Sequence, residues 1–127
     1  MKERIDSFQQ ALQRLQEALA EPETSLTRDA SIQRFEFTME LAWKSVQKFL
    51  ANEQIICQSP KSCFQEAFTF GLVQDEQSWI SMMDDRNLTV HTYNEELAKE
   101  IYGRLDGYLP TLKALSDKLR LLSADRT

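Results

Sequence analysis

The chain has 127 residues, which fits a single domain spanning residues 1–127, and 42% of them are hydrophobic, enough for one core. Glycine and proline are scarce at three each, which disfavours a turn-rich β fold, and no apolar run approaches the roughly 20 residues that a membrane span needs. The formal net charge of −5 repels nucleic acid on average, so any work on RNA must depend on a local basic site.

The cysteines and the N-terminal segment indicate a cytoplasmic protein that does not enter a membrane. Cys57 and Cys63 are six positions apart, which is neither CxxC nor a zinc-ligand spacing, and the chain has one histidine. The first ten residues are polar and periodic, unlike a signal peptide. We therefore expect two reduced thiols and no metal site.

Two long amphipathic helices are predicted in the first half of the chain. In residues 2–20, apolar side chains recur at spacings of three and four, and Pro22 closes the helix. Residues 29–52 repeat this spacing but add apolar residues outside the stripe, namely Phe37, Leu41, Trp43 and Leu50. A helix that is apolar on several faces is central in a bundle or shared with a partner, so the surplus leaves room for a dimer face.

Two short helices are predicted next. Ser59 and Pro60 supply a cap and a first-turn proline for a helix that stops at Gly71. Asp75 is the expected cap of the following helix, which continues through Arg86 to about residue 90.

The sequence Thr92-Tyr93-Asn94-Glu95 matches the S/T-x-x-E capping box and predicts the start of a third long helix. Its apolar stripe stays in phase on both sides of Pro110, which should kink the helix rather than end it. Three long and two short helices predict an all-α fold, an up-and-down bundle of four or five helices.

The residues that can carry chemistry cluster in the sequence RNLTVHTY, residues 86–93. Asn87 and His91 share a helix face, whereas Arg86 and His91 lie about 140° apart on a regular helix. Arg86 and His91 converge only if the helix loosens near its end or if two copies of the motif meet across a two-fold axis.

This group of side chains is sufficient for metal-free cleavage of RNA. His91 can activate the ribose 2′-OH or protonate the leaving oxygen, and Arg86 can stabilise charge on the phosphate oxygens. Asn87 can orient either group. DNA lacks the 2′-OH, so this chemistry predicts RNA specificity. Tyr93, near the start of a helix, is a plausible acceptor for a nucleotidyl group.

Each of these residues also has a structural interpretation. His91 can be a hydrogen-bonded residue between helices, and Tyr93 can be a packing residue with an exposed hydroxyl. Arg86 can pair with Asp84, Asp85 or a glutamate of the second long helix.

The pattern Arg86-Asn87-x3-His91-x-Tyr93 resembles the R-x4-6-H signature of HEPN domains, and more narrowly the bacterial branch known as nucleotidyltransferase substrate-binding proteins, which includes HEPN toxins. The similarity extends over residues 34–98. It includes Arg34-Phe35-Glu36-x3-Glu40-Leu41-x-Trp43-Lys44, followed by Pro60, Ala67, Gly71 and Trp79.

The resemblance implies a two-fold homodimer that joins two R-x4-H motifs at a cleft. It also implies a metal-independent endoribonuclease, the toxin of a toxin–antitoxin pair, with Arg86 and His91 as catalytic residues. The antitoxin would be a minimal nucleotidyltransferase that uses ATP to attach AMP to Tyr93 and silence the nuclease, and the toxin itself would need no cofactor.

Two other functions stay open at this point. One is a non-catalytic module in which Arg86 and His91 bind a nucleotide or substrate for a partner nucleotidyltransferase. The other is a purely structural helical adaptor, in which alanine at either position alters only stability.

Overall fold

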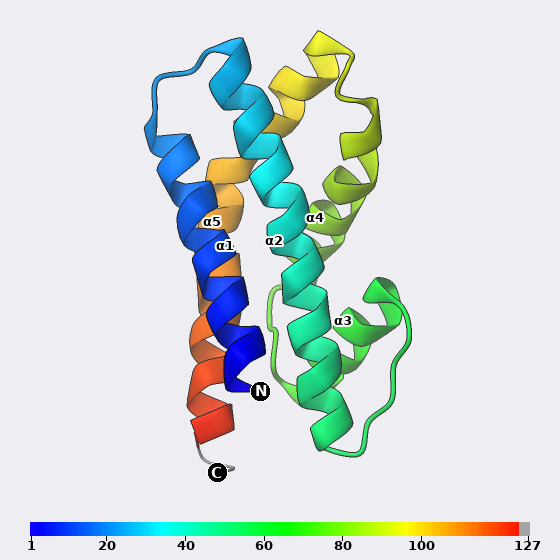
Figure 1. Cartoon of the computed structure of the whole chain (residues 1–127). Coiled ribbons are helices and arrows are strands. Elements are labelled where there is room, and N and C mark those ends of the chain that lie inside the picture. The colour runs from blue at the N-terminus through cyan, green and yellow to red at the C-terminus, as the bar shows by residue number, and fades with distance from the viewer. Residues whose placement is uncertain (125–127) are drawn as a thin grey trace.

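The computed structural model describes residues 1–124, which form five α-helices and one short 3₁₀ turn with no strand. The elements in chain order are α1 (Lys2–Ala20), α2 (Ser25–Asn52), α3 (Pro60–Phe70), α4 (Glu76–Leu88), the 3₁₀ turn η1 (Thr89–His91) and α5 (Glu95–Ala124). Helices α1, α2, α4 and α5 alternate in direction along one long axis (Figure 1). The predicted all-α, up-and-down bundle is therefore confirmed.

Helix α2 is central to the bundle. It contacts α1 and α5 on one side and α3, α4 and η1 on the other. This position explains most of its apolar surplus, because Leu50 is fully buried and Leu41 and Trp43 pack half-buried against the core. Phe37 is half-buried, and the guanidinium of Arg14 lies 5.8 Å from its ring centre.

The hydrophobic core follows the predicted stripes on the three long helices. Every stripe residue of α2 is buried, and the exposed faces of α1 and α5 are mostly polar, with Leu121 of α5 as an exposed exception. The largest fully buried side chains are Phe8, Phe35, Phe49, Ile5, Leu15, Leu50, Met82, Ile101, Leu105, Leu112, Leu115 and Leu119.

Helix α2 begins four residues before the predicted start at Asp29. Thr24 is its cap, and the hydroxyl of Thr24 accepts a hydrogen bond from the backbone N–H of Thr27 at 3.1 Å. The hydroxyl of Thr27 in turn accepts from the backbone N–H of Thr24 at 2.7 Å. Thr27 thus takes the role that the capping-box pattern gives to Glu or Gln, so the pattern did not reveal this start.

Helix α3 begins and ends as predicted, whereas α4 begins as predicted but ends at Leu88 rather than near residue 90. Ser59 caps α3, Pro60 is its first residue, and Gly71 ends it with a φ of 95°, a left-handed conformation that favours glycine. Asp75 caps α4 by accepting from the backbone N–H of Ser78 at 3.2 Å.

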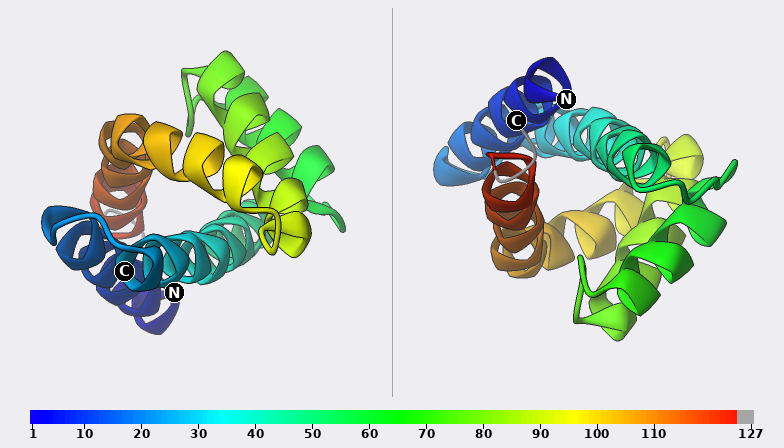
Figure 2. Two further views of the ribbon diagram at one scale, coloured as in Figure 1. Left: turned by 90° about the horizontal axis from the view of Figure 1, so that it is seen from above. Right: turned by 90° about the horizontal axis from the view of Figure 1, so that it is seen from below.

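Helix α5 continues through Pro110 to Ala124, as predicted. Its axis changes direction in the orange part of the ribbon, which both views along the bundle show (Figure 2). A proline inside a helix removes one backbone hydrogen bond and clashes with the preceding turn, which accounts for the bend.

The prediction of two reduced thiols is wrong. Cys57 and Cys63 form a disulfide, with their Cα atoms 5.2 Å apart. Cys57 lies in the segment before α3, and Cys63 lies in the first turn of α3, which brings the two side chains together. The side-chain amide of Gln47 also donates to the Cys57 carbonyl at 2.9 Å, so this segment is held to α2.

None of the helices within residues 1–124 combines the length and the apolar composition needed to cross a membrane.

Candidate functional site

The predicted site residues lie where α4 loosens into η1 and the chain turns into α5. The hydroxyl of Thr89 donates to the carbonyl of Arg86 at 2.7 Å, and the hydroxyl of Thr92 donates to the carbonyl of Thr89 at 2.8 Å. Thr89 is also buried, which ties the turn to the core. The loosening of the helix expected near Val90 is therefore present, one residue earlier than predicted.

The cap of α5 is Asn94, not Thr92 as the capping-box pattern predicted. The side-chain oxygen of Asn94 accepts from the backbone N–H of Leu97 at 3.1 Å, and α5 begins at Glu95. Thr92 instead ends η1 with a φ of −76° and a ψ of 2°, which differ from the extended backbone of a helix N-cap. Residues 92–94 thus separate the end of η1 at His91 from the start of α5 at Glu95.

His91 and Tyr93 lie on the outside of this turn. Both side chains are exposed, and the exposed fraction of Tyr93 is 86%. Their ring centres are 6.1 Å apart, with the ring planes at 77°, an edge-to-face arrangement. An exposed phenol at this position does not contribute to the core, which argues against Tyr93 as a packing residue.

Arg86 points from α4 toward α2 and pairs with Glu40, its Nη2 lying 3.9 Å from Glu40 Oε2. Glu40 also accepts a hydrogen bond from the indole N–H of Trp43 at 3.0 Å and pairs with Lys44 at 3.1 Å. The hydrogen bond from Trp43 is the main cause of a lowered pKa of Glu40, and Lys44 and Arg86 add to it against the opposing effect of burial. The predicted pairing of Arg86 with a glutamate of the second helix is therefore confirmed.

A groove of about 650 Å³ separates α2 from α3 and α4, and Arg86 and Asn87 lie in its wall. Other wall residues are mostly apolar and include Trp43, Phe68, Ile80 and Met83. Charged residues of both signs, among them Lys61, Glu76 and Asp84, also line it. A groove of this size and composition suits a nucleotide or an apolar protein surface.

One buried polar cluster beside the site was not predicted. Asp85 is 4% exposed and accepts two hydrogen bonds from Arg104 of α5, at 2.8 Å from Nε and 2.7 Å from Nη2. The hydroxyl of Tyr108 donates to the same carboxylate at 2.5 Å. Burial is the main cause of a pKa of Tyr108 well above its usual value, and the hydrogen bond to Asp85 adds to it.

The sequence contains a signal for this cluster. Arg104 and Tyr108 are four residues apart and share one face of α5, and a tyrosine in an apolar stripe requires a partner for its hydroxyl. The apolar period of α5 accounts for the ring of Tyr108 but not for its hydroxyl.

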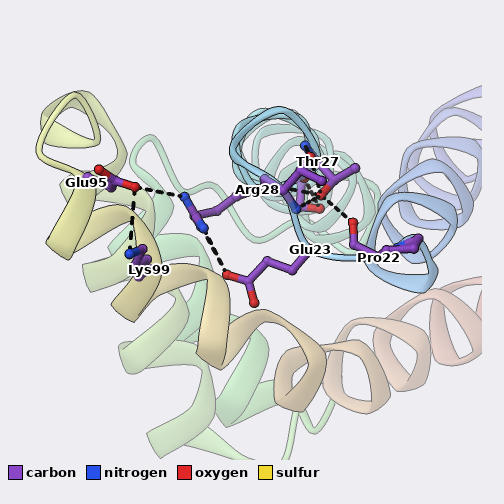
Figure 3. Close-up of polar contacts among 8 residues, drawn as sticks. Pro22, Glu23, Thr27, Arg28, Glu95 and Lys99 are labelled. Carbon is purple, nitrogen blue, oxygen red and sulfur yellow. Dashed lines mark hydrogen bonds and ion pairs between the residues drawn. The ribbon is translucent and has the colours of Figure 1, made fainter.

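Buried Arg28 near the start of α2 connects the beginning of α5 to the α1–α2 loop (Figure 3). It pairs with Glu23 at 3.1 Å and with Glu95 at 3.7 Å, and Lys99 also pairs with Glu95 at 3.7 Å. These pairs hold the first turn of α5, directly after the segment that contains His91 and Tyr93.

A single chain brings His91 close to Tyr93 and places Arg86 with Asn87 in the groove wall. Arg86 and His91 are not joined by any hydrogen bond or ring contact in residues 1–124. Of the two conditions for their convergence, the loosened helix is present, and a two-fold pairing of chains is the other.

Comparison with known proteins identifies relatives over most of the chain. The family described as "Nucleotidyltransferase substrate binding protein like" matches residues 3–121. The chain is 35% identical over 95 residues to a "Probable ribonuclease HepT" of Haemophilus influenzae, an alignment that covers 71% of the chain and 65%, just under two thirds, of that protein.

Two solved structures share the fold. One is a Thermus thermophilus protein with 41% identity and a TM-score of 0.84, matched over 89% of the chain and 98% of its own. The other is a Haemophilus influenzae protein described as the substrate-binding domain of a nucleotidyltransferase. It has 27% identity and a TM-score of 0.83, and the match covers 91% of the chain and 98% of that protein.

Proposed function

The chain belongs to the nucleotidyltransferase substrate-binding protein family, whose fold is HEPN-like, and we propose that it is a metal-independent endoribonuclease, the toxin of a toxin–antitoxin pair. The observation that carries the proposal is the turn at residues 86–93, which presents Arg86 in a groove and His91 beside an exposed Tyr93. The similarity to a probable ribonuclease supports the same reaction class.

The proposed reaction transfers the phosphodiester to the neighbouring ribose oxygen. The imidazole of His91 takes the proton of the 2′-OH, the 2′-oxygen forms a bond to phosphorus, and the bond from phosphorus to the 5′-oxygen breaks. A water molecule supplies the proton that the leaving 5′-oxygen takes up, which completes the step. The guanidinium of Arg86 stabilises the charge that builds on the other phosphate oxygens, and Asn87 orients the phosphate or the imidazole.

The proposed active unit is a homodimer, because a two-fold axis would bring Arg86 and His91 of two chains together at one cleft. The groove face offers exposed apolar side chains on α3 and α4, with Phe68 42% and Ile80 40% exposed. Its charged residues are of both signs, so a second copy related by a two-fold axis can oppose Lys61 to Glu76 or Asp84. We propose that such a pairing would bring Arg86 of one chain to the turn at residues 86–93 of the other.

Regulation is proposed to act at Tyr93. A partner nucleotidyltransferase would hold ATP, the phenol oxygen would attack the α-phosphorus, pyrophosphate would leave, and the phenol proton would pass to solvent. The product is AMP esterified to Tyr93. The 86% exposure of this side chain allows an enzyme to reach it, and its ring contact with His91 places the added phosphate beside the catalytic base.

The test is cleavage of a panel of single-stranded RNAs by the purified protein in the presence of EDTA. Wild-type protein should cleave and leave 2′,3′-cyclic phosphate ends, whereas Arg86→Ala and His91→Ala should lose at least about 100-fold in rate. Tyr93→Phe should cleave normally and resist modification by the partner with ATP. Equal inertness of wild type and His91→Ala on every RNA, together with no toxicity in cells, would overturn the proposal.

A second function is a non-catalytic subunit that binds a nucleotide or substrate for the partner nucleotidyltransferase. The observation that favours it is the groove of about 650 Å³, in which Trp43, Arg86 and Asn87 offer an aromatic ring, a cation and an amide. Micromolar nucleotide binding that Arg86→Ala abolishes, with no RNA cleavage, would select this function over the nuclease.

A further inference from the structure

Asp85 is a buried, fully paired carboxylate at the position directly before Arg86, and the proposed reaction does not use it. Its partners come from α5, with Arg104 binding both carboxylate oxygens and Tyr108 binding one of them. A planar guanidinium that binds a carboxylate through two hydrogen bonds restricts both the distance and the rotation between the two groups. The cluster therefore fixes how α4 is rotated against α5.

Successive residues of a helix are turned by about 100°, so a helix that presents Asp85 to α5 presents Arg86 to a different neighbour. That neighbour is α2, where Arg86 pairs with Glu40 at 3.9 Å. Rotation of α4 about its own axis would move Arg86 away from the groove and would pull Asp85 away from Arg104. The two contacts thus hold two different sides of the same turn.

The connection from this turn to His91 is short and hydrogen-bonded. The hydroxyl of Thr89 donates to the Arg86 carbonyl at 2.7 Å, and Thr89 is 5% exposed. The carbonyl of Thr89 accepts from the hydroxyl of Thr92, which follows His91 directly. A change in the orientation of the last turn of α4 is therefore transmitted to the imidazole.

We propose that Asp85, held by Arg104 and Tyr108, is a positioning residue that sets the orientation of Arg86 and His91. The expected effect on kcat rests on the proposed nuclease function, whereas the expected effect on the orientation of Arg86 and His91 does not. Asp85 touches no substrate in this scheme and acts only through the rotation of α4.

The test compares Asp85→Asn with the matched control Asp106→Asn, which changes an exposed aspartate of α5 in the same way. Arg104→Lys serves as a second variant, since it retains the positive charge but cannot bind both oxygens; its 44% exposed side chain makes the change easy to accommodate. His91 is the chain's one histidine, so its Hε1–Cε1 NMR signal is a unique reporter of the imidazole environment.

At a temperature where all variants are folded, Asp85→Asn and Arg104→Lys should shift or broaden the His91 signal, and Asp106→Asn should leave it unchanged. On an RNA substrate, the first two should lower kcat at least about tenfold with little change in KM, because the arginine still binds phosphate but is misaligned with the imidazole. Folded Asp85→Asn and Arg104→Lys proteins with a wild-type His91 signal would overturn the proposal. If wild-type protein cleaves no RNA, the nuclease function fails, and the His91 signal alone decides whether Asp85 positions the turn.

Discussion

The ionisation of Tyr108 is coupled to folding. Burial, followed by the hydrogen bond to Asp85, raises its pKa above the usual value of about 10. The folded chain thus holds the phenol proton more tightly than the unfolded chain does. This contribution to the free energy of unfolding is fully present below pH about 10 and is lost as the pH rises above that value.

We therefore expect the free energy of unfolding of wild-type protein to fall more steeply above pH 10 than that of Tyr108→Phe. At pH 7 the variant should be less stable by about 2 kcal/mol, the value of a hydrogen bond to a charged group. Urea unfolding followed by circular dichroism from pH 7 to 11 measures both effects. Tyr93→Phe, which changes an exposed tyrosine, should follow the wild-type curve, and a Tyr108→Phe curve parallel to wild type would contradict the expectation.

Pairing of Arg86 with a glutamate of α2 was one of three structural interpretations that the sequence offered, and it is the one found. Asp85 was not predictable, because nothing in the local sequence distinguishes it from exposed Asp84. Its burial depends on a rotation of α4 that is set by two residues of α5, 19 and 23 positions later in the chain. A pairing between residues so far apart in the chain cannot be recognised from a short stretch of sequence.

At the scale of the helix, Asn94 defines where α5 begins. Asn94→Ala removes the side-chain oxygen that accepts from the N–H of Leu97 and should lower stability by about 1 kcal/mol. Asn94→Asp retains an acceptor oxygen and should be nearly neutral. Thermal unfolding at a fixed protein concentration measures the difference, and an Asn94→Ala protein as stable as Asn94→Asp would contradict this assignment of the cap.

Helix bodies were predicted more accurately than helix starts, for a physical reason. The apolar period of α1 or α5 is repeated many times and determines which face is buried, so no single residue decides the prediction. A cap depends on one hydroxyl or amide, and both Thr92 and Asn94 are good caps. The choice between them is made by η1, since Thr92 ends that turn with a backbone conformation unlike that of a helix N-cap.

At the scale of the whole molecule, the order and direction of the helices follow from the stripes and the short connections, but the pairing of cysteines does not. Spacing alone gave no indication of the Cys57–Cys63 bond, which depends on the way the chain enters α3. The same limit applies to the proposed dimer, because the apolar surplus of α2 is explained mostly by its central position and does not locate a shared face. We propose the groove as that face, since Phe68 of α3 and Ile80 of α4 are exposed there.

The homodimer predicts a specific response to charge in the groove face. Ile80→Glu places a carboxylate where a second copy would cover a 40% exposed apolar side chain, beside Asp84 of the same helix. Desolvation of this charge should weaken dimerisation roughly 30-fold, which corresponds to about 2 kcal/mol. Sedimentation velocity across a micromolar dilution series should then show mainly the 14.8 kDa chain, where wild type shows twice that mass.

The matched control is Leu121→Glu on α5, which makes the same kind of change at a 61% exposed leucine outside the groove wall. It should leave the dimer intact, because the proposed interface at the groove does not include that face. If two chains together complete the active site, Ile80→Glu should also lose RNA cleavage in proportion to its loss of dimer, and raising its concentration should restore both together. A wild-type protein that stays monomeric at every concentration, or an Ile80→Glu monomer that cleaves at the wild-type rate, would show that the site is complete within a single chain.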